Sequence, residues 1–144
     1  MEKKEKALEL FNGSFNCSQA VFTVFAEEIG LEKEEALKIS CGFGGGMARM
    51  GNTCGAVTGA YMAIGLKYGK SKPEDNEARD ITFSKIHQFS DEFKKKNNSL
   101  VCNELLGCDY GSPEGRKFAA DNNLHSKICN NLVADAVEIV EKLL

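Results

Sequence analysis

The chain has 144 residues, of which 42% are apolar and 27% are charged, and only two are prolines. This length fits one ordinary domain with a real hydrophobic core, and the composition excludes disordered and fibrous proteins. The formal net charge of −3 offers no basic surplus of the kind that nucleic-acid binding requires. We therefore expect residues 1–144 to form a single helical domain with no nucleic-acid partner.

The sequence also argues against membrane insertion and secretion. The longest apolar stretch, Cys54 to Leu66, is shorter than the roughly 20 residues that a membrane-spanning helix needs. The charged opening, Met1 to Lys6, is not followed by the apolar segment of a secretory signal. We expect a cytoplasmic protein without a membrane span, a setting in which a scaffold of permanent disulfides is uncommon.

Apolar residues recur at three- and four-residue steps along most of the chain, which is the pattern of amphipathic helices. The clearest stripe runs from Cys129 through Val133 and Val137 to Val140. No stretch alternates apolar and polar residues as a half-buried strand would. The sequence therefore predicts an all-α fold, a bundle of seven or eight helices with one glycine-rich loop. The helices are expected at 2–12, 17–29, 33–41, 53–68, 73–96, 100–106, 113–122 and 126–143.

The glycine-rich loop contains Gly42, Gly44, Gly45 and Gly46. Glycine loses much backbone freedom on folding, so such a run requires a sharp turn or a close approach. The segment lacks both the Gly-Lys-Ser/Thr ending and the preceding strand of a phosphate-binding loop. An irregular turn joining two tightly packed helices is the better interpretation.

A second set of glycines, Gly51, Gly55 and Gly59, falls at four-residue spacing, and Ala63 continues the row. Each glycine inside a helix costs about 0.5–1 kcal/mol relative to alanine. The bare face must therefore be approached closely, either by another helix backbone or by a cofactor. A cofactor would bind against the wall formed by Gly55, Gly59, Gly44, Gly45 and Gly46.

Six cysteines occur in the chain, and none form a Cys-x-x-Cys pair, so a thioredoxin-type motif and a zinc ribbon are excluded. Four of them follow a capping residue by one or three positions, which predicts first-turn helical sites where N–H groups lower the thiol pKa. The same positions would also suit cysteines that pack as small apolar groups, and both interpretations stay open. The pairs of cap and cysteine are Asn16 and Cys17, Thr53 and Cys54, Ser99 and Cys102, and Ser126 and Cys129.

At these residues the sequence resembles the C-GCAxxG-C-C family of redox-active proteins. The motifs are Asn16-Cys17-Ser18-Gln19-Ala20-Val21, Gly42-Phe43-Gly44-Gly45-Gly46-Met47, Thr53-Cys54-Gly55-Ala56-Val57-Thr58-Gly59-Ala60, and Cys102-Asn103-Glu104-Leu105-Leu106-Gly107, followed by Cys129. The four cysteines that define the family map onto Cys17, Cys54, Cys102 and Cys129. The resemblance implies redox activity, and a similar segment in split-Soret cytochromes favours an iron–sulfur centre. Cys41 and Cys108 fall outside the four and are expected to be packing residues or, for Cys108, an extra thiol.

Two redox chemistries follow for the four cysteines. They could hold an iron–sulfur cluster, most simply [2Fe–2S], for electron transfer, or pairs of them could cycle between dithiol and disulfide as an oxidoreductase. The alternative is a non-enzymatic helical binding or scaffold module, with or without a structural metal. The redox partner is unknown, and a homodimer is compatible with the sequence. His87 is expected in solvent, and His125 could neighbour Cys129.

Overall fold

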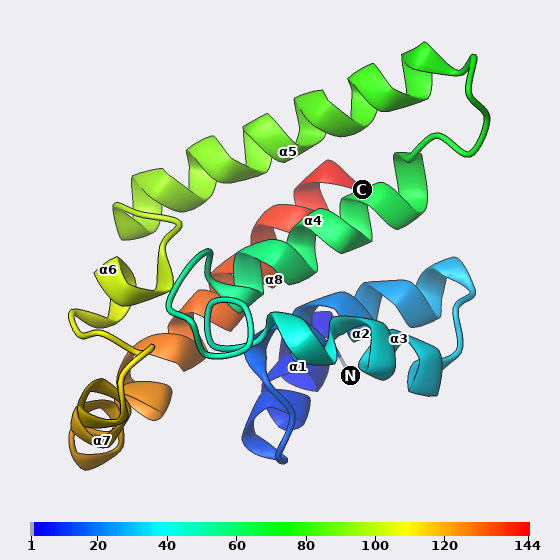
Figure 1. The fold of residues 1–144 in the computed structure, drawn as a ribbon. Helices are drawn as coiled ribbons and strands as arrows, with labels where there is room; N and C mark the ends of the chain where they lie inside the picture. The colour runs from blue at the N-terminus through cyan, green and yellow to red at the C-terminus, as the bar shows by residue number, and fades with distance from the viewer. Residues whose placement is uncertain (1) are drawn as a thin grey trace.

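Eight α-helices build the fold in a computed structural model that describes residues 2–144 (Figure 1). Within that range the only β-type pairing is an isolated antiparallel bridge between Thr53 and Val101, so the all-α prediction is confirmed. No helix in the described part of the chain is both long enough and apolar enough to cross a membrane. The helices are α1 (Lys3–Asn12), α2 (Cys17–Ile29), α3 (Lys33–Ser40), α4 (Gly55–Tyr68), α5 (Asn76–Asn97), α6 (Cys102–Leu106), α7 (Pro113–Asp121) and α8 (Asn130–Leu143), with a 3₁₀ turn η1 (Cys41–Phe43) and a π-helical turn η2 (His125–Cys129).

The helix limits follow the sequence pattern, and the differences have local causes. α2 begins and ends as predicted, because Asn16 and Gln19 form a complete capping box at its start. α5 begins at Asn76 instead of residue 73, because the Asp75 side chain caps it. The last helix begins as the π-helical turn η2, which runs directly into α8.

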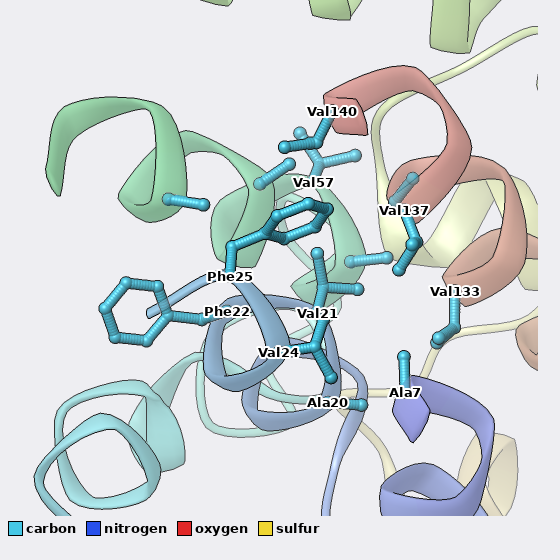
Figure 2. Close-up of a cluster of buried hydrophobic side chains, with 14 of the residues drawn as sticks. Ala7, Ala20, Val21, Phe22, Val24, Phe25, Val57, Val133, Val137 and Val140 are labelled. Carbon is cyan, nitrogen blue, oxygen red and sulfur yellow. The ribbon is translucent and has the colours of Figure 1, made fainter. Parts of the chain in front are cut away.

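The core lies where α2, α4 and α8 meet. In Figure 2 the side chains of these three helices point toward one another, and Ala7 of α1 closes one side. Complete burial of a valine or phenylalanine side chain contributes roughly 1.5–3 kcal/mol, so this contact is a main source of the fold's stability. The buried side chains there include Val21, Val24, Phe25, Val57, Val133, Val137 and Val140.

The direction of the helices determines where the cysteines lie. α2, α4 and α8 run the same way in Figure 1, and α5 returns in the opposite direction. The N-terminal ends of the three core helices therefore share one end of the bundle with α6 and α7. A second, smaller apolar cluster at this end contains Cys102, Leu106, Ala119 and Leu124. The segments that lead into or begin α2, α4, α6 and α8, which carry Cys17, Cys54, Cys102 and Cys129, thus gather at one end of the molecule.

The contact between α2 and α4 is the most extensive in the fold, and it depends on two glycines. A Cβ at Gly59 would lie 2.8 Å from the carbonyl oxygen of Ser18, and a Cβ at Gly55 would overlap the sulfur of Cys17. Close packing of two helix backbones therefore explains these two members of the glycine row. Gly51 is different, because it precedes α4 and has a φ of +75°.

Two alanine substitutions in α4 should have opposite effects on stability. Gly59→Ala should lower the free energy of unfolding by about 1–3 kcal/mol, because its Cβ meets backbone that cannot move aside. Gly65→Ala should raise it by about 0.5–1 kcal/mol, since no atom lies within 4 Å of the added Cβ. Urea unfolding followed by circular dichroism measures both, and equal effects would contradict the proposed packing role of Gly59.

Candidate functional site

A cavity of about 850 Å³ lies among the helix starts at this end of the bundle. Its walls come from the end of α1, the starts of α2 and α4, and parts of α6, α7 and η2. Gly44, Gly45 and Gly55 line it, whereas Gly46 and Gly59 do not. The structure thus brings cysteines that are distant in sequence to one cavity. The cysteines that line it are Cys17, Cys41, Cys54, Cys102 and Cys129.

Asn16 fixes the start of α2 and with it the position of Cys17. The Asn16 side chain accepts a hydrogen bond from the Gln19 N–H at 3.0 Å, and the Gln19 side chain accepts one from the Asn16 N–H at 2.9 Å. The amide of Asn16 also donates to the Cys41 carbonyl at 2.9 Å, which ties the end of α3 to the same place. The predicted capping box is confirmed, and Cys17 is the first residue of α2.

An antiparallel bridge brings the segments before α4 and α6 together. The N–H of Cys54 donates to the Leu100 carbonyl at 2.8 Å, and the N–H of Cys102 donates to the Asn52 carbonyl at 2.6 Å. Because the two hydrogen bonds flank the bridge on either side, they fix the register of one segment against the other. Cys54 and Cys102 therefore enter their helices from paired backbone.

Three of the four predicted caps do not form. Thr53 pairs with Val101 in the bridge, and the Ser99 hydroxyl accepts the N–H of Val101 at 3.0 Å, so neither residue caps a helix. Ser126 lies inside the π-helical turn that continues into α8. Cys129 is consequently inside a continuous helical segment and not at a free helix start. Single π-helical turns are frequent at functional sites.

The glycine-rich loop is a left-handed turn that packs against the cysteine-bearing segments. Residues 45–49 all have positive φ, between 49° and 70°. A Cβ at Gly44 would overlap the side chain of Asn16, and a Cβ at Gly46 would lie 2.7 Å from the Cβ of Cys102. The predicted tight turn is therefore present, and the glycines serve both its conformation and its close contacts.

Burial raises the pKa of four of the cysteines. It raises the pKa of Cys102 and Cys129 to about 12, raises the pKa of Cys17, and raises that of Cys54 well above its ordinary value. Backbone N–H groups act in the opposite direction on Cys17, with Gly45 as the main donor. The prediction of lowered thiol pKa values is wrong, because the cost of desolvating a thiolate exceeds the gain from these N–H groups.

The four family cysteines are also close enough to affect one another. After burial, negative charge on Cys17 is a further cause that raises the pKa of Cys54, Cys102 and Cys129. All six cysteines are free thiols. Among residues 2–144, no three histidine, cysteine, aspartate or glutamate side chains converge on a position for one metal ion. The thiols surround a cavity instead of meeting at a point.

The two remaining cysteines differ from each other. Cys41 is exposed at the cavity, so the expectation that it is a packing residue is wrong. Cys108 is half-buried against the second apolar cluster. After burial and the neighbouring thiols, its charge further raises the pKa of Cys102 and Cys129, which places it beside the site as an extra thiol.

Several cavity residues were missed by the sequence interpretation. Arg49, Arg116 and Tyr110 line the cavity, and Arg116 donates from Nη1 to the Tyr110 carbonyl at 3.0 Å. His125 was not missed: it was expected near Cys129, and it lines the same cavity as Cys129 and stacks on Phe11 with ring centroids 3.9 Å apart. The sequence contained one indication that its arginines have a special position: the chain has only three arginines but fifteen lysines.

A comparison with protein families supports the resemblance. The family model described as "Putative redox-active protein (C_GCAxxG_C_C)" matches residues 15–143. The chain belongs to the C_GCAxxG_C_C family. An uncharacterized protein of Archaeoglobus fulgidus resembles this C_GCAxxG_C_C chain, with 28% identity over 151 aligned positions that cover 96% of this chain and 93% of that protein. No solved structure matches it significantly.

In this C_GCAxxG_C_C protein, the exposure and the pKa of each cysteine predict how fast it reacts with iodoacetamide. In reduced, metal-free protein at about pH 8, a thiol whose pKa is raised from 9.0 to about 12 holds roughly a thousandfold less thiolate. Exposed Cys41 should therefore be alkylated first, and Cys102 and Cys129 should react far more slowly. Their rates should keep rising as the pH increases toward about 12, because thiolate accumulates only there.

Mass spectrometry of the digested protein gives the rate at each cysteine. As a control, the differences among cysteines should disappear in concentrated urea, which removes burial. Rapid alkylation of Cys102 or Cys129 in folded protein near neutral pH would show that these thiols are reactive and would contradict the expected order.

Proposed function

We propose that Cys17, Cys54, Cys102 and Cys129 hold a [2Fe–2S] cluster and that the protein transfers single electrons between redox partner proteins. The observation that carries this proposal is the placement of four thiols with raised pKa values around one cavity, with Cys54 and Cys102 buried and Cys17 and Cys129 half-buried. Four cysteine thiolates are a complete ligand set for such a cluster. When bound, the cluster would supply one-electron transfer.

Burial favours metal ligation over thiol–disulfide exchange. An attacking thiol in exchange must be accessible and must ionise near ambient pH, whereas burial raises the pKa of Cys102 and Cys129 to about 12. Coordination to a metal deprotonates a thiol outright and releases its proton. A raised pKa in the metal-free protein is therefore compatible with a ligand and unfavourable for a nucleophile.

The backbone around the cavity suits a group with electron-rich sulfurs. Backbone N–H groups of Gly45 and Gly55 lower the pKa of the Cys17 thiol against the larger effect of burial. Hydrogen bonds to sulfur and exclusion of solvent are the means by which a protein sets the reduction potential of an iron–sulfur site. In this proposal the glycine-rich loop contributes to the potential through its backbone N–H groups.

Colour provides the direct test. Protein purified without oxygen should be brown, with visible charge-transfer absorption and about two irons and two sulfides per chain. Colourless protein that binds no iron under reconstitution would overturn the proposal. If its thiol count then falls in steps of two with mild oxidant, thiol–disulfide chemistry replaces it; if the count does not change, a scaffold role replaces it.

Serine variants identify the ligands. Cys17→Ser, Cys54→Ser, Cys102→Ser and Cys129→Ser should each lose most of the iron and the visible absorption, because serine is a poor replacement for a thiolate ligand. Cys41→Ser is the matched control, since Cys41 lines the same cavity but is outside the ligand set. Iron content per folded chain is the measurement. Loss of iron in Cys41→Ser, or full retention in any of the four, would require a different ligand set.

A further inference from the structure

Among the described residues that line the cavity, two arginines are the only lysine, arginine, aspartate or glutamate side chains. Arg49 comes from the left-handed turn and Arg116 from α7. Within residues 2–144, neither arginine forms an ion pair with a carboxylate. A concave site with two cations and no acidic residue favours an anionic guest.

The choice of arginine is selective in this chain. Two of its three arginines line the cavity, while fifteen lysines supply nearly all its other positive charge. The guanidinium group is a planar fork that matches carboxylates and oxoanions in a bidentate manner, which a lysine ammonium does not. The third arginine, Arg79, lies on α5 and is paired with Asp80 at 2.9 Å.

The two arginines adjoin the cysteines through Tyr110 and Gly45. Arg116 uses Nη1 to bind the Tyr110 carbonyl, and its guanidinium carries further N–H donors. A Cβ at Gly45 would lie 2.9 Å from Cγ of Arg49 and 3.1 Å from Cε2 of Tyr110, so both side chains pack on this glycine. Gly45 and Cys17 in turn line the same cavity as the two arginines. The cationic wall and the thiols are therefore parts of one site.

The rest of the cavity is suited to an apolar molecular body. Phe11, Leu105 and Leu124 are among its lining residues, and the aromatic ring of Phe11 is held by its stack with His125. The volume of about 850 Å³ falls within the roughly 300–1,000 Å³ of small-molecule sites. A few convergent polar groups in a mainly apolar cavity are the usual composition of such sites.

We propose that Arg49 and Arg116 bind the carboxylate or oxoanion of a small organic molecule whose apolar part enters the cavity beside the cysteines. This inference rests on the proposed function in that the anion would be a substrate of the same redox site. It makes the protein a binder of a small molecule as well as a carrier of electrons.

Benzoate and its neutral counterpart benzamide provide a matched pair of probes. Each is titrated into the full chain, purified without oxygen, with binding followed by ligand-detected NMR. Benzoate should bind more tightly than benzamide, and Arg49→Gln and Arg116→Gln should each weaken benzoate roughly tenfold or more, as loss of a charge-assisted hydrogen bond predicts. Arg79→Gln is the control and should bind benzoate as the natural sequence does.

The outcomes separate this proposal from the cluster. Equal binding of the two probes, no binding of benzoate, or equal weakening by Arg79→Gln would overturn the anion site. The anion site would also be overturned if Arg49→Gln and Arg116→Gln changed the iron content but left benzoate binding unchanged. Colourless protein that binds benzoate through the two arginines would retain the anion site and remove the cluster, and brown protein that does not bind it would do the reverse.

A chemical-modification experiment on the natural sequence tests the site without any substitution, so it applies even if the glutamine variants fail to fold. Phenylglyoxal modifies arginine side chains, and its sites can be mapped by mass spectrometry. Benzoate should protect Arg49 and Arg116 and leave the modification of Arg79 unchanged. Equal modification of all three arginines with and without benzoate would count against the site.

Discussion

The close approach of α2 to α4 is the contact on which the rest of the molecule depends. It exists because Gly55 and Gly59 present no side chain to α2. A side chain at Gly55 would occupy the position of the Cys17 sulfur, so the same absence that lets the helices pack also leaves space for that thiol. The core of valines from α2, α4 and α8 forms around this contact (Figure 2). The packing of the core and the assembly of the site therefore both require that Gly55 and Gly59 have no side chain.

Assembly of the site has an electrostatic consequence. Helix starts, which ordinarily favour thiolates, are here enclosed by packed helices, and the loss of solvent dominates their effect on the pKa. The two tendencies are separable at Cys17, where burial raises the pKa and the N–H of Gly45 lowers it. In the proposed function these thiols lose their protons only when they coordinate a metal. Their burial contrasts with the accessible, readily ionised cysteines that thiol exchange requires.

Features that depend on residues close together in the sequence were predicted correctly. The helical periodicity identified every helix, and the capping box at Asn16 and Gln19 forms as predicted because both partners belong to one turn. The caps expected at Thr53 and Ser99 failed because segments about fifty residues apart pair with each other, and such pairing is not written in local spacing. The sign of the thiol pKa shifts failed for the same reason, since burial is a property of the assembled fold.

A joint site for Cys17, Cys54, Cys102 and Cys129 was expected from the family resemblance, but the two arginines that line the same cavity were not expected. Arg49 reaches the cavity only because the chain around it adopts a left-handed conformation, which no helical or strand pattern signals. Arg116 reaches it through the packing of α7. The small number of arginines was the one feature of the sequence that indicated a special role for Arg49 and Arg116.

The left-handed turn connects these two parts of the site. Residues 47–49 are not glycines, and each left-handed residue of this kind costs about 1–2 kcal/mol. Such strain persists where the surrounding structure fixes the backbone, and it is concentrated at functional sites. Here Gly44 is held against Asn16 and Gly46 against Cys102, so the turn is clamped between two cysteine-bearing segments. Relaxation of the turn would move both Gly45 and Arg49 from their places in the cavity wall at the same time. The clamped, left-handed backbone therefore holds Arg49 in fixed relation to the cysteine-bearing segments.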